Sequence, residues 1–134
     1  MGVGTPFKRL QKKSGYDAIV IGSGLGAMTF GAIMAKQGKK ILLLEKHYVA
    51  GGFTHVFKRK EYEWDVGIHY VGDVHKDFTF MSIMFDYITD HQLKWTEMDE
   101  VYDRVVIEGR IYDFRSGKEN FIEMLHQRFP EEQK

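Results

Sequence analysis

Three small residues stand where an apolar run ends and a helical pattern begins. Gly22, Gly24 and Ala27 follow the apolar residues 18–21 in the spacing G-x-G-x-x-A. Glycine permits a tight turn at the first position, and at the second it lets the backbone approach a pyrophosphate without a Cβ in the way. The following helix would present free N–H groups and a partial positive charge to the phosphates. The pattern therefore predicts a phosphate-binding turn.

Glu45 lies where a ribose-binding acid is expected. It follows a second apolar run, residues 41–44, close to the offset of ~20 residues that separates such an acid from the glycine turn. A carboxylate there would accept hydrogen bonds from ribose hydroxyls and repel a 2′-phosphate, which disfavours NADP. The alternative is an ordinary βαβ turn with a surface glutamate. A strand before the motif and a helix after it favour the dinucleotide site.

A βαβ unit would bring these residues together. We expect residues 18–21 and 41–44 to form short buried strands, and residues 25–37 to form a helix between them. Gly38 should cap the C-terminus of that helix. The helix face expected to pack on the strands carries Ala27, Phe30 or Gly31, and Met34. The predicted fold class is therefore α/β, with a Rossmann-like βαβ unit.

The rest of the chain is predicted to add a β-hairpin and further helices to that unit. The expected elements are strands 53–57 and 61–64 around a basic turn, a helix over 77–90, a hairpin of strands 101–107 and 110–114 around Gly109, and a helix opened by a capping box at Ser116–Glu119 that ends before Pro130. The stripe of Phe78, Met81, Phe85 and Ile88 is expected to be core rather than the lining of a substrate tunnel.

The composition excludes several classes of protein. The chain has 134 residues, with 19 basic and 19 acidic residues and no cysteine, so we expect no nucleic-acid binding and no thiolate metal site. No apolar run approaches the ~20 residues that span a bilayer, and residues 1–15 lack the apolar centre of a secretory signal. We expect residues 1–15 to be a basic flexible arm, and the location to be cytoplasmic or membrane-peripheral. The basic residues of the arm are Lys8, Arg9, Lys12 and Lys13.

A second glycine pair, Gly51 and Gly52, follows Glu45 and again allows close approach of a ligand. The stretches GSGLGAM (22–28), LLLEKHYVAGG (42–52) and FKRKEYEWDVGIHYVG (57–72) resemble the N-terminal FAD-binding part of the phytoene desaturase/retinol saturase family of flavoproteins. A weaker similarity continues through RVVIEGRIYDF and SGKENFIEMLHQRFPEE, so the resemblance covers nearly the whole chain.

The resemblance implies FAD as the cofactor and assigns parts of it to motifs. The first glycine motif matches the family's pyrophosphate turn, Glu45 its ribose acid, and the second glycine pair a flavin-contacting segment. Two positions depart from the family pattern: Ala27 replaces a glycine, and Phe53 stands where many desaturases have arginine. The expected cofactor-binding residues are Gly22, Ser23, Gly24, Leu25, Gly26, Ala27, Glu45, Lys46, Gly51, Gly52, Asp65, Gly67 and His69. No catalytic residue and no metal ligand follow from the sequence.

Members of this family form or reduce carbon–carbon double bonds in polyenes such as retinoids and carotenoids. The resemblance therefore implies an FAD-dependent oxidoreductase with an apolar polyene substrate and with NAD(P)H or another electron carrier. Two alternatives stay open, a Rab GDP-dissociation inhibitor-like binding protein without flavin and an amine oxidase-like flavoenzyme. Because such enzymes are several times longer, we expect residues 16–134 to be the N-terminal portion of an FAD/NAD(P)-binding domain, incomplete and inactive alone.

Overall fold

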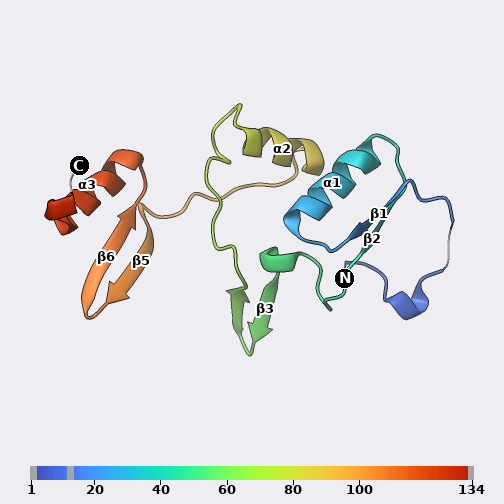
Figure 1. The fold of residues 1–134 in the computed structure, drawn as a ribbon, viewed down its shortest axis with the longest axis horizontal. Helices are drawn as coiled ribbons and strands as arrows, with labels where there is room; N and C mark the ends of the chain where they lie inside the picture. The colour runs from blue at the N-terminus through green and yellow to red at the C-terminus, as the bar shows by residue number, and fades with distance from the viewer. Residues whose placement is uncertain (1–2, 12–13, 133–134) are drawn as a thin grey trace. The chain divides into compact units, whose positions relative to one another are not determined.

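The computed structural model describes residues 3–11 and 14–132 of the chain. They form two compact units, Met1–Lys94 and Trp95–Lys134. Figure 1 shows the elements of each unit, coloured from blue at the N-terminus to red at the C-terminus. The chain combines helices with three two-stranded sheets, which agrees with the predicted α/β class.

The N-terminal arm contains one short element, an exposed 3₁₀ turn over Phe7–Arg9. Residues 1–2, together with Lys12 and Lys13 of the expected basic arm, lie outside the described residues. Within the described part of the chain, no helix has the length and apolar character needed to cross a membrane.

The expected βαβ unit is confirmed. Strands β1 (Ala18–Ile21) and β2 (Ile41–Leu44) pair in parallel, residue by residue along their whole length. Helix α1 (Leu25–Lys36) connects them and packs against both strands (Figure 1). The ends of β1 and β2 therefore lie side by side, which places the residues that follow each strand close together.

The inner face of α1 includes Gly31 rather than Phe30. A Cβ on Gly31 would lie 3.8 Å from Cγ2 of Ile41 in β2, so glycine lets the helix approach the strand closely. Phe30 is largely exposed. Of the two alternatives that the sequence left open, the structure therefore selects Gly31.

Gly38 ends α1 as expected. Its φ of 79° is in the left-handed region, where glycine carries no steric penalty. The Gly38 N–H donates to the Ala35 carbonyl at 2.9 Å, and the Lys39 N–H donates to the Met34 carbonyl at 3.0 Å. This pair of bonds is a Schellman motif, which satisfies carbonyls that the helix end would leave unpaired.

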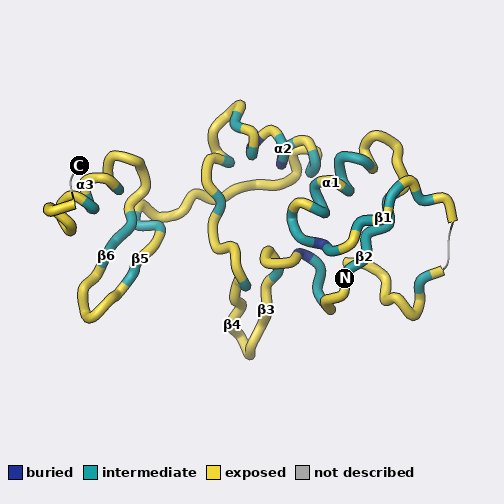
Figure 2. Tube along the Cα trace, in the orientation of Figure 1, coloured by how far each residue is buried: buried dark blue, intermediate teal, exposed yellow. Residues whose placement is uncertain are grey.

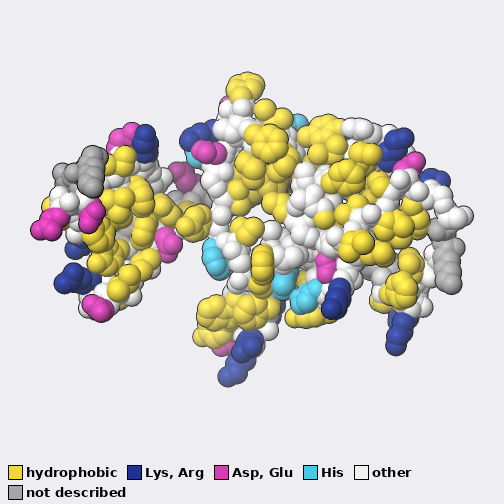
Figure 3. All heavy atoms as spheres, viewed as in Figure 1, with side chains coloured by type: hydrophobic (Ala, Val, Ile, Leu, Met, Phe, Trp, Pro, Cys, Tyr) yellow, Lys and Arg dark blue, Asp and Glu magenta, His cyan; other side chains and the backbone are white. Residues whose placement is uncertain are grey.

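One face of the β1–β2 pair is open. Along β1, Ala18 and Val20 are half-buried, whereas Ile19 and Ile21 are exposed, Ile21 to 87% (Figure 2). The prediction that this strand is buried was wrong for Ile19 and Ile21, whereas all four residues of β2 are half-buried. Figure 3 shows hydrophobic side chains at the visible surface of this unit.

A 3₁₀ turn, η2 (Gly52–Thr54), precedes an antiparallel hairpin of β3 (Val56–Arg59) and β4 (Tyr62–Asp65). The predicted strand 53–57 therefore starts too early, because Phe53 and Thr54 belong to the turn. Lys60 has a φ of 56° at the tip of the hairpin, and all residues of both strands are exposed. Of the basic cluster expected as a solvated turn, only Lys60 lies in the turn, whereas Lys58 and Arg59 end β3, and all three are exposed.

Helix α2 (Phe80–Thr89) starts later than the predicted helix over 77–90 and packs against α1. Phe78 has a φ of 64° and lies outside the helix, 91% exposed, so its place in the expected core stripe was wrong. Phe85 is 7% exposed, and the two other members of the stripe are half-buried, as expected.

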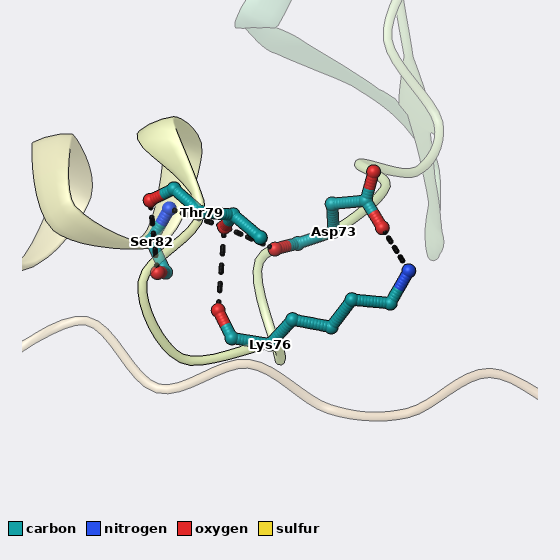
Figure 4. A network of polar contacts seen from close by, with 4 residues as sticks. All are labelled: Asp73, Lys76, Thr79 and Ser82. Carbon is teal, nitrogen blue, oxygen red and sulfur yellow. Dashed lines mark hydrogen bonds and ion pairs between the residues drawn. The ribbon is translucent and has the colours of Figure 1, made fainter.

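The hydroxyl of Thr79 fixes the start of α2 (Figure 4). Its Oγ1 accepts a hydrogen bond from the Ser82 N–H at 3.2 Å and donates to the Asp73 carbonyl at 2.7 Å. The Nζ of Lys76 lies 2.5 Å from Asp73 Oδ1, and its hydrogen bond lowers the pKa of that carboxyl. A compact loop of four polar residues therefore sets where the helix begins.

The second unit consists of a hairpin covered by one helix. Strands β5 (Val101–Ile107) and β6 (Arg110–Arg115) pair in antiparallel, and helix α3 (Lys118–Arg128) packs on β6 before a final 3₁₀ turn (Pro130–Glu132). The predicted hairpin and the helix end before Pro130 are confirmed. Ring pairs hold the helix on the strand: Phe114 with Phe121 at 5.7 Å, and Tyr112 with Phe129 at 6.2 Å between centroids.

The predicted capping box at Ser116–Glu119 was wrong. Gly117 is the N-cap residue of α3, with a φ of 101°, and no side chain caps the helix. Instead, the Nδ2 of Asn120 donates to the Ser116 carbonyl at 2.7 Å. A serine in the capping position was not sufficient, because Gly117 turns the chain before the helix begins.

We expect Thr79→Ala to lower the free energy of unfolding of the first unit by about 1 kcal/mol, because it removes the only side-chain cap found on α2 among the described residues. Thr79→Ser keeps the hydroxyl and should stay close to the unchanged chain. Thermal unfolding of both variants checks this, and equal losses in the two would contradict a capping role for the hydroxyl.

Candidate dinucleotide-binding site

The turn after β1 leaves space for a ligand at its glycines. Gly22 has a φ of 97°, and its N–H donates to the Leu44 carbonyl at 2.7 Å, which ties the end of β1 to the end of β2. A Cβ added to Gly22 or Gly24 would meet nothing within 4 Å. The open space lies where the sequence predicts a pyrophosphate, so the residues present fit that group.

The N-terminus of α1 adds unpaired donors to this turn. Gly24 is the N-cap, no side chain caps the helix, and its first turn contains no acidic residue. The first N–H groups of any helix lack partners inside the helix. Those of Leu25, Gly26 and Ala27 are therefore placed to donate to an anion, with the helix dipole adding positive potential.

Ser23 lies at the centre of the site and is only 1% exposed. Figure 2 shows a buried stretch where the chain enters α1. The N–H and the hydroxyl of Ser23 both donate to Oε2 of Glu45, at 2.7 and 2.5 Å. The same hydroxyl accepts a hydrogen bond from the Gly51 N–H at 2.9 Å. One side chain thus joins the first glycine turn, Glu45 and the second glycine segment.

Glu45 is held as a carboxylate. The hydroxyl of Ser23 is the largest cause that lowers its pKa from the usual 4.5 to about 2, followed by the His47 N–H, which donates to Oε1 at 2.7 Å. A carboxylate oxygen accepts about two hydrogen bonds. Of these hydrogen bonds, Oε2 accepts two from Ser23 and Oε1 accepts one from the His47 N–H.

The second glycine segment touches the first. Gly51 and Gly52 have φ values of 125° and 58°, and a Cβ on Gly52 would lie 2.9 Å from Cα of Gly24. No L side chain can be placed there without moving one backbone away from the other. Thr54 fixes the segment from the other side, since its Oγ1 donates to the Gly51 carbonyl at 2.6 Å.

Two histidines that lie beside the site were not predicted from the sequence. The rings of His47 and His55 lie 4.8 Å apart, and His55 Nδ1 contacts the Gly52 carbonyl. His47 follows the ribose acid by two positions, which places its N–H within reach of the carboxylate. The sequence gives no comparable signal for His55, whose position depends on the 3₁₀ turn before β3.

The later predicted site residues divide into two groups. The Gly67 N–H donates to the Phe53 carbonyl at 3.2 Å, and this brings Gly67 next to the second glycine segment. Asp65 and His69 face each other, with 3.7 Å between Asp65 Oδ2 and His69 Nδ1, and both are exposed. Lys46 is also exposed. Their roles toward a cofactor stay predictions.

Acidic residues and histidines do not gather into a metal site in the described part of the chain, where no group of three or more such side chains could hold an ion.

The family model of the NAD(P)-binding Rossmann-like domain matches residues 20–87, just over half of the chain. The chain belongs to this family. The matched range contains both glycine segments and Glu45, so the NAD(P)-binding Rossmann-like assignment and the geometry point to the same residues. Membership implies a dinucleotide cofactor.

Curated relatives agree with the resemblance seen in the sequence. All-trans-retinol 13,14-reductase of Danio rerio is 41% identical over 124 residues, which cover 88% of the chain and 20% of that protein. An inactive all-trans-retinol 13,14-reductase of Danio rerio is 39% identical over 122 residues, with 88% and 20% covered. Prolycopene isomerase 2, chloroplastic, of an Oncidium hybrid cultivar is 38% identical over 66 residues, covering 49% and 11%. The predicted similarity to the phytoene desaturase/retinol saturase family is confirmed.

The chain spans about a fifth of the length of the retinol reductases that it matches. Both carry the name of the reductase, and one of the two is named as inactive. Similarity over this stretch therefore supports an oxidoreductase resemblance without deciding the reaction of the whole protein.

We expect Gly52→Ala to lower the free energy of unfolding by at least about 2 kcal/mol. The alanine would have to adopt a left-handed φ, and its Cβ would contact the Gly24 backbone. Gly26→Ala is the matched control. Its Cβ would meet nothing within 4 Å, and alanine in a helix should stabilise the chain by up to about 1 kcal/mol. Thermal unfolding of the two variants checks this, and similar melting temperatures would contradict the close backbone contact.

We expect the side-chain carboxyl of Glu45 to titrate with a midpoint at about pH 2. The chemical shift of its carboxyl carbon, measured against pH, gives this midpoint. Its pKa is lowered in the folded chain, so its contribution to stability is complete above pH 4.5 and is lost as the pH falls toward 2. Glu45→Gln identifies the signal by removing it. A midpoint near 4.5 would show that the hydrogen bonds from Ser23 and His47 are absent in solution.

Proposed function

We propose that the chain binds the ADP part of FAD, as the nucleotide-binding segment of a flavin-dependent oxidoreductase that acts on carbon–carbon double bonds of a polyene. The observation that carries this is the arrangement of an open glycine turn, an ionised Glu45 and a second glycine segment around the hydroxyl of Ser23. Family membership supports a dinucleotide, and the resemblance of the motifs to flavoproteins supports FAD.

The residues take separate parts of the nucleotide in this proposal. The pyrophosphate lies against Gly22 and Gly24 and accepts hydrogen bonds from the first N–H groups of α1. Oε1 of Glu45 accepts a hydrogen bond from a ribose hydroxyl. An ionised carboxylate at this place repels a 2′-phosphate, which disfavours NADP.

The second glycine segment favours FAD over NAD. It adds a second backbone stretch, Gly51–Gly52, at the nucleotide site, and Gly67 lies beside this stretch through Phe53. When bound, a flavin supplies hydride-transfer chemistry. The chain's own residues would bind and orient the cofactor, and none of the described side chains is assigned a proton or hydride step.

The polyene substrate is the part of the proposal that depends on relatives. Two of them carry retinol in their names and one carries prolycopene, both of which are conjugated polyenes. Neither a Rab GDP-dissociation inhibitor-like nor an amine oxidase-like function is favoured by an observation here. An open cradle with an ionised acid has no purpose in a binding protein that uses no nucleotide.

A flavin titration tests the proposal on the chain itself. We expect FAD to shift the amide NMR signals of residues 22–27 and of Gly51 in a saturable way, and ADP to compete with it. FMN lacks the AMP part of FAD and should bind much more weakly. Glu45→Gln should weaken FAD binding by about tenfold or more, because it removes the charge of a hydrogen-bond acceptor.

Glu108→Gln is the control variant, since Glu108 lies at the exposed hairpin turn of the second unit. It should bind FAD as the unchanged chain does. Equal binding of FAD and FMN, or unchanged affinity in Glu45→Gln, would overturn the assignment of the ADP part to this site.

A further inference from the structure

Ser23 occupies an unusual position for a serine in a ligand-binding turn. It follows Gly22 in the open phosphate turn, yet its side chain is turned inward and is only 1% exposed. Among the described residues, no other side chain is less than 2% exposed. A hydroxyl that is withdrawn from the ligand space while its neighbours line that space must act on other residues of the protein.

The hydrogen bonds of Ser23 identify those residues. Its hydroxyl has one proton, which it donates to Oε2 of Glu45, and it accepts one hydrogen bond from the Gly51 N–H. The two partners lie 22 and 28 positions further along the chain. Few other chemical groups can perform both tasks, because the same atom must be donor and acceptor.

We propose that Ser23 is the positioning residue of the nucleotide site, whose hydroxyl sets the orientation of Glu45 and the place of the second glycine segment together. This inference rests on the proposed function and adds to it a residue that controls affinity without touching the cofactor.

The geometry explains why both partners depend on one hydroxyl. With Oε2 of Glu45 held by Ser23, Oε1 is left for the ribose. With the Gly51 N–H held by the same oxygen, the following Gly52 stays against the Gly24 backbone. Loss of the hydroxyl would leave the Gly51 N–H without its partner and would allow the Glu45 carboxylate to rotate.

A purely structural role predicts a different result from a positioning role. If Ser23 only fills space, its removal lowers stability as any buried serine does and leaves the binding geometry unchanged. Ser82 offers the matched comparison, because it is also buried but lies in α2, where its hydroxyl bonds to the Thr79 carbonyl. Ser82→Ala should cost stability without changing Glu45 or FAD binding.

The test uses the full chain with Ser23→Ala, Ser23→Thr and Ser82→Ala. We expect Ser23→Ala to raise the titration midpoint of Glu45 above about 2, because the largest cause of the lowered pKa is gone. It should also shift the Gly51 amide signal and weaken FAD binding by at least about fivefold. Ser23→Thr keeps the hydroxyl and should restore both the midpoint and the affinity.

Failures of this inference and of the proposed function can be told apart. If the unchanged chain does not bind FAD in preference to FMN, the proposed function fails, and this inference fails with it. If the unchanged chain binds FAD and Ser23→Ala binds equally well with an unchanged Glu45 midpoint, only the role of Ser23 is overturned. If threonine does not fit the buried space, Ser23→Cys adds less volume than threonine and makes weaker hydrogen bonds. It should then fall between alanine and serine in the Glu45 midpoint, and a midpoint equal to that of serine would overturn the role.

Discussion

The hydrogen bonds of the Ser23 hydroxyl are the interaction on which the candidate site depends. In the sequence, α1 and β2 separate Ser23 from Glu45 and Gly51. These residues meet only because β1 and β2 pair in parallel with their ends aligned. The bond from the Gly22 N–H to the Leu44 carbonyl extends this pairing by one step into the turn. The βαβ unit is small, yet it is sufficient to place Glu45 beside the glycine turn predicted to bind phosphate.

Glycine has two different functions in this unit. At Gly22 and Gly24 a Cβ would meet nothing, so the missing side chain leaves room on the ligand side of the turn. At Gly52 a Cβ would collide with the Gly24 backbone, so the missing side chain allows two parts of the protein to touch. The first kind of glycine leaves open space, whereas the second allows close backbone packing, although both appear in the sequence as members of glycine motifs.

Sequence reasoning succeeded where local chemistry decides the structure. The bounds of β1 and β2 and the cap at Gly38 follow from short apolar runs and from a glycine able to take a left-handed φ. It failed at Phe78, which the helical spacing placed in the core, because the chain takes a left-handed φ there before Thr79 caps the start of α2. The sequence predicted that the glycine turn, Glu45 and the second glycine segment would lie together, and the structure brings them together. The inward orientation of Ser23 was not predicted, because a G-x-G motif does not show which way its middle side chain points.

Family membership and type of reaction do not go together among the relatives of this chain. The NAD(P)-binding Rossmann-like match ends at residue 87, within the first compact unit, whereas the hairpin and helix of the second unit form a separate set of contacts. Relatives with similar identity include a reductase, a protein named as inactive, and an isomerase. Similarity over this stretch is therefore shared by proteins whose names differ in activity. It identifies the family of the first unit and does not by itself identify a reaction.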